Sequence, residues 1–257
     1  MSARLRVFIT GASSGLGRAI AIRYAQQGAI LGLVARDAIK LASLISELET
    51  ETVHYALDVR DTLAIQHAAR DFITRYGAPD IVVASAGASC GNLTEIAEDI
   101  TVFQSLLDIN VVGMVKTFQP FIDAMRQTNQ GTLIGIASVA GFRGLPGASA
   151  YSASKAAVIA YLESLRVELR NSGISVMTVC PGYIDTPMTA INPYPMPFIL
   201  KPDRAAEIIV HAVQKRRLFI TIPWQMAIVG FFLRRMPNIL YDLLFAKAPH
   251  KPRNVRI

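Results

Sequence analysis

The sequence predicts an α/β fold: a doubly wound, seven-stranded parallel sheet with helices on both faces, followed by an apolar helical extension at the carboxyl end. Short apolar runs rich in β-branched residues alternate with longer segments of helical periodicity, and this alternation is typical of a parallel sheet covered on both faces. The chain has 257 residues, of which 52% are hydrophobic. A chain of this length and composition can bury one large core, which excludes a disordered protein, a coiled coil and a disulfide-stapled module.

The elements follow from these patterns in chain order. Strands are predicted at residues 5–10, 30–35, 53–57, 81–84, 132–137, 175–180 and 218–222. Helices are predicted up to residue 25 after the first strand, and at residues 38–49, 62–76, 99–126 and 151–170. Residues 188–202 contain four prolines among apolar side chains, so we expect a loop there that lies against apolar material.

Three glycines follow the first strand, at Gly11, Gly15 and Gly17. Glycine at such positions lets the backbone turn tightly and approach a pyrophosphate above the amino end of the next helix, where free N–H groups and the helix dipole favour anions. The order of strand, glycine turn and helix therefore predicts a Rossmann-type dinucleotide site. We expect residues 1–222 to form this dinucleotide-binding and catalytic domain, with a substrate loop at 186–202.

The end of the second strand usually reads the 2′ position of the adenine ribose. Ala35 brings no carboxylate there, and Arg36 offers a guanidinium that can pair with a phosphate. The sequence therefore favours NADP(H) over NAD(H). Asp37 would weaken this preference if it faced the ribose, but it is also suited to be the N-cap of the second helix.

Tyr151 and Lys155 are one helical turn apart, and therefore lie on the same face of the predicted helix. A tyrosine has a pKa of about 10, and lowering this pKa by two to three units requires about 3 to 4 kcal/mol of stabilisation of the phenolate. An ammonium at about 4 Å, in an effective dielectric constant of about 20, supplies about that amount. We therefore expect a tyrosine that donates and accepts protons, with Ser138 at the end of the fifth strand beside it.

Five motifs in this order resemble the short-chain dehydrogenase/reductase family in its short form, over about residues 5–220. They are the segment Thr10-Gly11-Ala12-Ser13-Ser14-Gly15-Leu16-Gly17, Asn110, Ser138, Tyr151 with Lys155, and Cys180-Pro181-Gly182. The resemblance implies that Tyr151 is the general acid or base and that Lys155 lowers its pKa and holds the nicotinamide ribose. It also implies that Ser138 orients the substrate carbonyl and that Asn110 holds a water of the proton relay.

The same resemblance implies a set of dinucleotide-binding residues, with no metal. Asp58, followed by Val59, resembles the contact to the adenine amino group, and Thr186 resembles the hydroxyl near the nicotinamide carboxamide. The full expected set is Gly11, Ser13, Ser14, Gly15, Leu16, Gly17, Arg36, Asp58, Val59, Ala86, Gly87, Tyr151, Lys155, Pro181, Gly182, Ile184 and Thr186. One departure is Ser85, where the family usually carries asparagine. Because a hydroxyl cannot bridge two backbone groups, the rigidity of this loop is in question.

The positive charge of the chain is concentrated near its carboxyl end. Residues 201–257 contain 11 Lys or Arg against 3 Asp or Glu, whereas residues 1–200 contain 15 against 16. The 16 uncharged residues at 218–233 are too few for a strand followed by a spanning helix, which needs about 20 residues. We expect residues 223–257 to be an extension and not an independent domain. Within it, 224–257 would lie on an anionic membrane surface, or would act as a lid or subunit contact. Nucleic acid is not expected, because no aromatic residues alternate with the basic ones.

These features together predict an NADP(H)-dependent oxidoreductase that interconverts a hydrophobic secondary alcohol and a ketone, such as a steroid, retinoid or lipid-like carbonyl. The resemblance implies a homodimer or homotetramer. The first strand begins by residue 5 and leaves no room for a secretory signal, so we expect a cytoplasmic protein, peripheral on the inner face of a membrane. Two alternatives remain open: a 3-oxoacyl thioester reductase that uses an acidic carrier protein, and a non-catalytic NADP(H)-binding sensor or scaffold.

Overall fold

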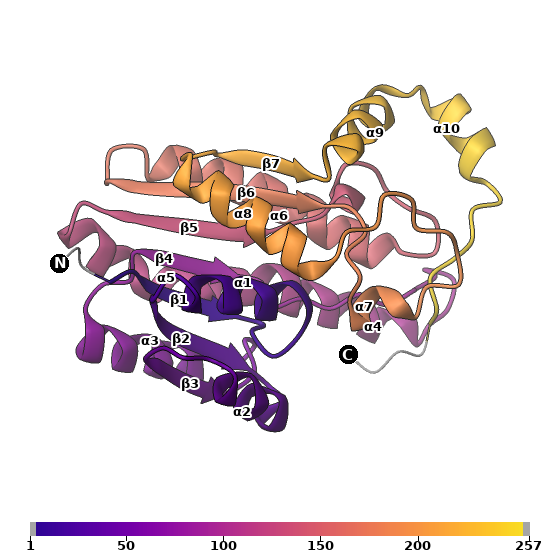
Figure 1. Cartoon of the computed structure of the whole chain (residues 1–257). Coiled ribbons are helices and arrows are strands. Elements are labelled where there is room, and N and C mark those ends of the chain that lie inside the picture. The colour runs from indigo at the N-terminus through magenta and orange to yellow at the C-terminus, as the bar shows by residue number, and fades with distance from the viewer. Residues whose placement is uncertain (1–3, 254–257) are drawn as a thin grey trace.

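A seven-stranded, all-parallel sheet runs through the molecule in the order β3-β2-β1-β4-β5-β6-β7 (Figure 1). The computed structural model describes residues 4–253. The strands are β1 (Arg6–Thr10), β2 (Ile30–Ala35), β3 (Thr52–Ala56), β4 (Ile81–Ala84), β5 (Gly131–Ile136), β6 (Ile174–Pro181) and β7 (Phe219–Ile222). The order reverses between β1 and β4, and ligands of such sheets bind at this point, beyond the carboxyl ends of the strands. The predicted fold class is therefore confirmed.

The strand register brings the carboxyl ends of the central strands to one level. Thr10, the last residue of β1, pairs with Val34 of β2 on one side and with Ala84 of β4 on the other. Ala84 in turn pairs with Gly135 of β5. The loops that follow these strands therefore open on the same edge of the sheet.

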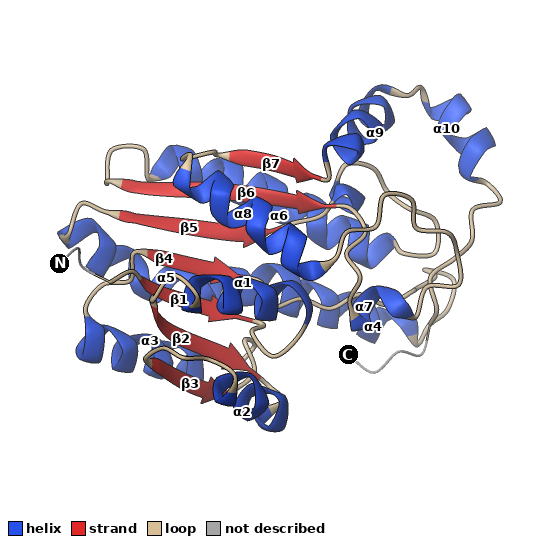
Figure 2. Ribbon diagram, viewed as in Figure 1, coloured by secondary structure: helices blue, strands red, loops and turns tan. Residues whose placement is uncertain are grey.

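Helices cover the sheet on both faces, as the alternation in the sequence predicts (Figure 2). They are α1 (Gly15–Ala25), α2 (Ala38–Ser46), α3 (Thr62–Tyr76), α4 (Asp99–Leu107), α5 (Gly113–Gln127), α6 (Ser149–Glu168), α7 (Pro187–Ala190), α8 (Pro202–Gln214), α9 (Trp224–Arg235) and α10 (Asn238–Phe245). Ile20 of α1 and Ile209 of α8 belong to the core on one face, whereas Phe118 of α5 and Leu162 of α6 belong to the core on the other.

Three elements differ from the sequence predictions. The helix expected over 99–126 is divided by a π-helical turn, Asp108–Val112, which separates α4 from α5. The segment expected as a loop contains one helical turn, α7, which begins at a proline, where a missing N–H costs nothing. Helix α8 has no counterpart among the predictions, although it also begins at a proline.

The last two helices extend from the carboxyl end of β7 beyond the body of the sheet (Figure 1). Both lie within the predicted apolar helical extension, but most of their apolar side chains face solvent: Trp224 is 68% exposed and Ile239 is 78% exposed. Over residues 4–253, no helix has both the length and the apolar character needed to cross a bilayer. After α10 the chain returns toward α4 and α7. Residues 254–257, at the end of the predicted extension, lie outside the described residues.

Candidate active site

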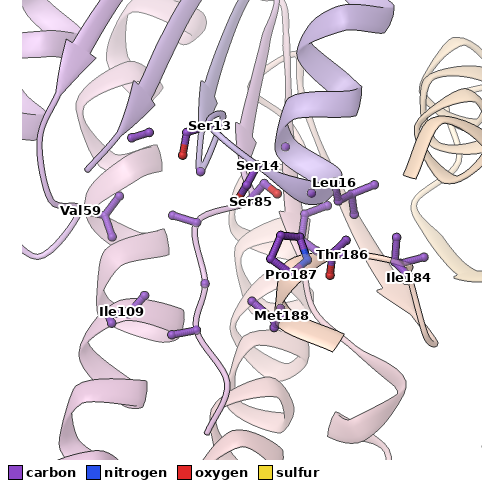
Figure 3. Close-up of a pocket in the computed structure, with 18 of the residues that line it drawn as sticks. Ser13, Ser14, Leu16, Val59, Ser85, Ile109, Ile184, Thr186, Pro187 and Met188 are labelled. Atoms are coloured by element: carbon purple, nitrogen blue, oxygen red, sulfur yellow. The ribbon is translucent and has the colours of Figure 1, made fainter. Parts of the chain in front are cut away.

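A cleft of about 810 Å³ opens at the carboxyl ends of β1, β2, β4, β5 and β6. In Figure 3, Val59 and Ile109 lie on one side of it, and Leu16 and Ile184 lie on the other. Every residue that the sequence analysis assigned to the dinucleotide lines this cleft, and so does Ser138. Ala35, Asp37 and Ser85, which the sequence analysis considered, also line it, as do Pro187, Met188 and Thr189 of the predicted substrate loop. Sequence reasoning missed these further lining residues: Val34, Lys40, Leu57, Ala88, Ile109, Ile136 and Ala137.

The glycine turn after β1 has no room for side chains. A Cβ on Gly17 would lie 2.3 Å from the carbonyl oxygen of Gly11, and a Cβ on Gly11 would lie 2.7 Å from the backbone of Ala86. Gly11 and Gly15 have φ values of +72° and +54°, which also favour glycine. The N-cap of α1, Ser14, makes no side-chain hydrogen bond to the first turn. The backbone N–H groups of that turn thus remain available at the cleft, and the turn fits a pyrophosphate.

The end of the cleft beside β2, where the sequence analysis expects the adenine ribose, contains two basic side chains, Arg36 and Lys40. Asp37 accepts a hydrogen bond from the backbone N–H of Lys40 at 3.0 Å and is therefore the N-cap of α2. That bond, with the Lys40 side chain, lowers the pKa of Asp37. Asp58 forms an ion pair with Arg60 at 2.7 Å and lies 3.9 Å from Arg36. Arg36 and Lys40 are thus the basic side chains at this end of the cleft.

Ser138 and Tyr151 meet at the other end of the cleft. Ser138 follows β5, where its Oγ accepts a hydrogen bond from the N–H of Ala140 at 3.1 Å and donates one to the carbonyl of Pro181 at 3.4 Å. Tyr151 lies in the first turn of α6. Burial raises the pKa of Tyr151, and a hydrogen bond with Ser138 opposes this rise.

Lys155 lies on the same face of α6 as Tyr151, as its spacing predicts. Its Nζ is 5.8 Å from the centroid of the Tyr151 ring and donates a hydrogen bond to the carbonyl of Ile136 at 2.8 Å. Burial lowers the pKa of Lys155 to about 8, which leaves the ammonium predominantly protonated at pH 7. That Lys155 lowers the pKa of Tyr151 stays a prediction, because burial and the hydrogen bond with Ser138 are the causes that act on this pKa here.

Asn110 lies in the π-helical turn between α4 and α5, behind the cleft. Its Oδ1 accepts a hydrogen bond from the N–H of Ala88 at 2.8 Å, and its Nδ2 donates to the carbonyl of Ala88 at 3.0 Å and to Ser154 at 2.9 Å. The amide thus bridges the two backbone groups of Ala88, in the loop that contains Ser85. Asn110 holds this loop against α6, a bridge that Ser85 itself cannot make.

The predicted substrate loop closes on itself beside the cleft. The N–H of Asp185 donates to the carbonyl of Leu200 at 2.8 Å, and the N–H of Leu200 donates to the carbonyl of Tyr183 at 2.9 Å. Between these bonds, α7 brings Met188 and Thr189 to the cleft. Phe198 and Ile199 are exposed near the end of the loop. Among the described residues, no group of three His, Cys, Asp or Glu side chains could hold a metal ion.

Comparison with known proteins shows the same pattern over most of the chain. The family model described as short chain dehydrogenase matches residues 6–193. An uncharacterized oxidoreductase from Myxococcus xanthus is 35% identical over 237 residues, which cover 91% of this chain and 93% of the relative. A 3-oxoacyl-[acyl-carrier-protein] reductase from Thermotoga maritima is 30% identical over 228 residues, which cover 83% of this chain and 92% of the relative.

Two solved structures have the same fold. An alcohol dehydrogenase from Thermococcus sibiricus, complexed with 5-hydroxy-NADP, matches with a TM-score of 0.75 at 27% identity and covers 86% of this chain and 96% of its own. A short chain dehydrogenase/reductase from Burkholderia phymatum, in complex with NAD, matches with a TM-score of 0.81 at 23% identity and covers 98% of each chain. One neighbour is thus described with an NADP analogue and the other with NAD. Together with the cleft and the matched residues, these findings show that the chain belongs to the short-chain dehydrogenase family, whose members are oxidoreductases acting on alcohol and ketone groups.

Proposed function

We propose that the protein interconverts a hydrophobic secondary alcohol and the corresponding ketone, with NADP(H) as the redox partner. The observation that carries this proposal is that Ser138, Tyr151 and Lys155 border the same cleft as the glycine turn. When bound in this cleft, the nicotinamide dinucleotide supplies the hydride for reduction or accepts it in oxidation.

In the proposed mechanism, the hydroxyl groups of Ser138 and Tyr151 bind the carbonyl oxygen of the substrate. During reduction, Tyr151 donates its proton to this oxygen, where negative charge develops. The ammonium of Lys155 lies near the ring and stabilises the phenolate that remains. Because the pKa of Lys155 is about 8, its charge is present at neutral pH and is lost as the pH rises. In oxidation, the same groups act in reverse.

NADP(H) is favoured because of the charges at the ribose end of the cleft. Arg36 and Lys40 both border it, and Asp37 is engaged with the amino end of α2. A 2′-phosphate there would meet two basic side chains, and hydrogen bonds between ionised groups are stronger than neutral ones. The remaining assigned lining residues, including Asp58 and Thr186, are proposed to hold the adenine and nicotinamide ends.

The proposed substrate is apolar, such as a steroid, a retinoid or a lipid-like carbonyl compound. Support comes from the loop at 186–202, where Met188 lines the cleft and Ile191, Phe198 and Ile199 are exposed nearby. Exposed apolar side chains in a loop beside a site provide contact area for an apolar ligand.

The test is a screen of ketones of graded chain length and ring size, with oxidation of NADPH followed by fluorescence and NADH run in parallel. We expect turnover that rises with the apolar area of the ketone and that is faster with NADPH. Equal rates with small polar ketones would contradict the substrate class. Faster turnover with NADH would contradict the cofactor preference.

We also propose that α9 and α10 rest on an anionic membrane surface. Their exposed apolar residues are Trp224, Ile228, Val229, Phe231, Phe232, Ile239, Leu240, Leu243 and Leu244. Arg234 and Arg235 at the end of α9 and Lys247 after α10 are exposed. An apolar helical surface edged by basic residues is the arrangement that binds at the interface of anionic lipids.

A second candidate activity is reduction of a 3-oxoacyl thioester presented by an acidic carrier protein. The observation that favours it is the set of exposed basic side chains on the extension, Arg234, Arg235 and Lys247, which would attract an acidic partner. Steady-state assays with 3-oxoacyl groups on carrier protein and on a short thiol separate the two: a preference for carrier-bound substrate that disappears at high salt would favour this candidate.

A non-catalytic sensor is a competing proposal. A sensor would bind the dinucleotide but show no turnover that depends on Tyr151.

We also propose a homodimer or homotetramer. Light scattering during size-exclusion chromatography gives the mass of the assembly directly. A mass near 28.0 kDa, that of one chain, would contradict the proposed oligomer.

A further inference from the structure

The chain after α10 returns to the catalytic end of the molecule, where residues 248–253 form a segment that we call the C-terminal strap. In Figure 1 it descends from α10 toward α7 and α4. The N–H of Gly91 donates a hydrogen bond to the carbonyl of Pro252 at 2.9 Å. A Cβ on Gly91 would lie 2.1 Å from the carbonyl oxygen of Lys251, so the strap passes directly over this glycine. The contact joins the strap to the loop after β4.

An ion pair fixes the end of the strap. The guanidinium of Arg253 donates to both carboxylate oxygens of Asp99, at 2.9 and 3.0 Å. The Asp99 side chain is only 8% exposed and also accepts a hydrogen bond from the N–H of Leu93 at 2.7 Å. A bidentate pair with a nearly buried carboxylate holds its partners in one geometry. The strap therefore has a defined place on α4.

The strap and α10 also contact the segment that precedes α6. The ring of His250 packs on Gly147, whose Cβ would lie 2.5 Å from it. The hydroxyl of Tyr241 donates to the carbonyl of Gly144, and the guanidinium of Arg143 lies 4.4 Å from the centroid of the Tyr241 ring. The extension thus contacts the loop that leads to Tyr151 at two points.

This path brings a second lysine to Tyr151. The Nζ of Lys251 lies 5.5 Å from the centroid of the Tyr151 ring, and the Nζ of Lys155 lies 5.8 Å from the same centroid. The two lysines are 96 positions apart in the chain. Within residues 4–253, no carboxylate lies within ion-pair distance of Lys251.

We propose that Lys251 is a positioning residue for the reaction: with the strap docked, its ammonium is the second positive charge that stabilises the phenolate of Tyr151. This inference rests on the proposed role of Tyr151 as the proton donor and acceptor. An ammonium over an aromatic ring is already favourable, and it becomes more so when the ring oxygen is ionised.

Among the described groups that surround Tyr151, the positive charges are those of Lys155 and Lys251. Ser138 contributes a hydrogen bond, Tyr194 is a neutral phenol nearby, and the Cys90 thiol lies next to Lys251. Burial lowers the pKa of Lys251 to about 8, as it does for Lys155. Both ammonium groups are therefore charged at pH 7, and ionisation of Tyr151 beside them raises the pKa of each, so that their charges are retained while the phenolate exists.

The test replaces Lys251 with methionine, which keeps an unbranched apolar stem but removes the charge. A charge at this distance changes the pKa of Tyr151 by on the order of one unit. We expect the acidic limb of the pH profile for alcohol oxidation, where Tyr151 must be ionised, to move up by about one unit, and kcat/KM at pH 7 to fall about tenfold. The KM for the dinucleotide should not change. Lys251→Arg should restore most of the activity.

Two control variants test whether the effect of Lys251→Met comes from the lost ammonium charge or from a change in the fold. Arg170→Met removes an exposed charge beyond the far end of α6 and should leave the pH profile unchanged. Arg253→Gln breaks the ion pair with Asp99, and should reproduce part of the shift because the strap is released. An unchanged pH profile in Lys251→Met would overturn the proposal. So would a rise in KM restricted to anionic substrates, which would assign Lys251 to substrate binding.

A spectroscopic titration makes the result independent of turnover. The ultraviolet absorbance of tyrosinate is measured against pH in the parent and in Lys251→Met, and each curve is corrected with the matching protein that carries Tyr151→Phe. We expect the Tyr151 component to titrate at higher pH in Lys251→Met. If no ketone is turned over but this shift is present, the proposed function fails and the inference stands. If turnover is found without the shift, the inference fails.

Discussion

The body of the sheet and the carboxyl-terminal helices use apolar side chains in opposite ways. On α1 and α8, Ile20 and Ile209 are fully buried against the sheet, whereas on α9 and α10 Phe232 is 62% exposed and Leu243 is 75% exposed. The core of the sheet is therefore complete without the exposed faces of the last two helices. Apolar side chains thus stabilise the fold in the body of the sheet, whereas on α9 and α10, by our proposal, they attach the protein to a membrane.

The first test removes the proposed proton donor and leaves the exposed surface of α9 and α10 unchanged. Tyr151→Phe should lower kcat/KM by about 10² to 10⁴, because general acid catalysis contributes this much and phenylalanine has no proton to donate. Dinucleotide affinity and vesicle binding should stay at the parental level. Stopped-flow rates measure turnover, fluorescence titration measures dinucleotide affinity, and co-sedimentation measures vesicle binding.

Tyr161→Phe is the matched control, because Tyr161 lies on the same helix but does not line the cleft. It should retain full turnover. If Tyr151→Phe and Tyr161→Phe behave alike, the proposed mechanism is wrong.

The second test breaks the dinucleotide end. Gly17→Ala places a Cβ 2.3 Å from the carbonyl oxygen of Gly11, and backbone cannot move aside as a flexible side chain can. Overpacking of this kind costs about 1–3 kcal/mol, so we expect dinucleotide affinity to fall by roughly five- to 100-fold. Isothermal titration measures the affinity. The control is Gly144→Ala, where no atom lies within 4 Å of the added Cβ.

The third test concerns the ribose end. Arg36→Ser removes one of the two basic groups there and should lower the preference for NADPH over NADH by about tenfold or more, since a hydrogen bond to a charged group is worth about 1.5–3 kcal/mol. The ratio of kcat/KM values for the two dinucleotides reports the change. An unchanged ratio would show that Arg36 does not read the 2′ position.

The fourth test changes only the apolar surface. Replacing Phe232 and Leu243 with serine should lower binding to anionic vesicles by about tenfold or more. Each apolar side chain that the lipid buries contributes about 1.5–3 kcal/mol, and these two side chains are exposed in the free protein. Turnover of a water-dispersed ketone should be unaffected. Co-sedimentation with vesicles measures the binding.

Ile39 and Leu63 provide the matched control for that surface, because they are 84% and 67% exposed on α2 and α3. Their replacement with serine should leave vesicle binding unchanged. Equal losses in the two double variants would mean that α9 and α10 have no special affinity for lipid.

The smallest expected effect is the pH dependence of the parent. Burial lowers the pKa of Lys155 to about 8. The charge that we propose to stabilise the Tyr151 phenolate is thus present below that pH and lost above it. The rate of ketone reduction should therefore fall several-fold between pH 7 and pH 9. Single-turnover reduction at saturating dinucleotide measures it, and a flat profile would contradict this role of Lys155.

The predictable parts of the fold are those set by local pattern. The strand at 81–84 and the helix at 62–76 have the predicted bounds, because a short apolar run marks the first and helical periodicity marks the second. Helix α8 was missed because its first residue, Pro202, was counted with the proline-rich segment before it, although proline is favoured in the first turn of a helix.

The site was predictable where glycine spacing and side-chain spacing alone position the groups, as at Gly17 and Tyr151. Two features depend on contacts that no local pattern encodes. The bridge from Asn110 to Ala88 needs the π-helical turn, and the approach of Lys251 to Tyr151 needs the strap to fold back over Gly91. Long-range packing determines both, so the sequence showed the residues without their partners.

The paired backbone bonds between 183–185 and 200 have a consequence for how this enzyme could diversify. Because the two ends of the intervening stretch are joined to each other, the residues between them can be exchanged as a block while the reacting groups on β5 and α6 stay where they are. Grafting that block between relatives should transfer a preference for one ketone over another without rebuilding the scaffold.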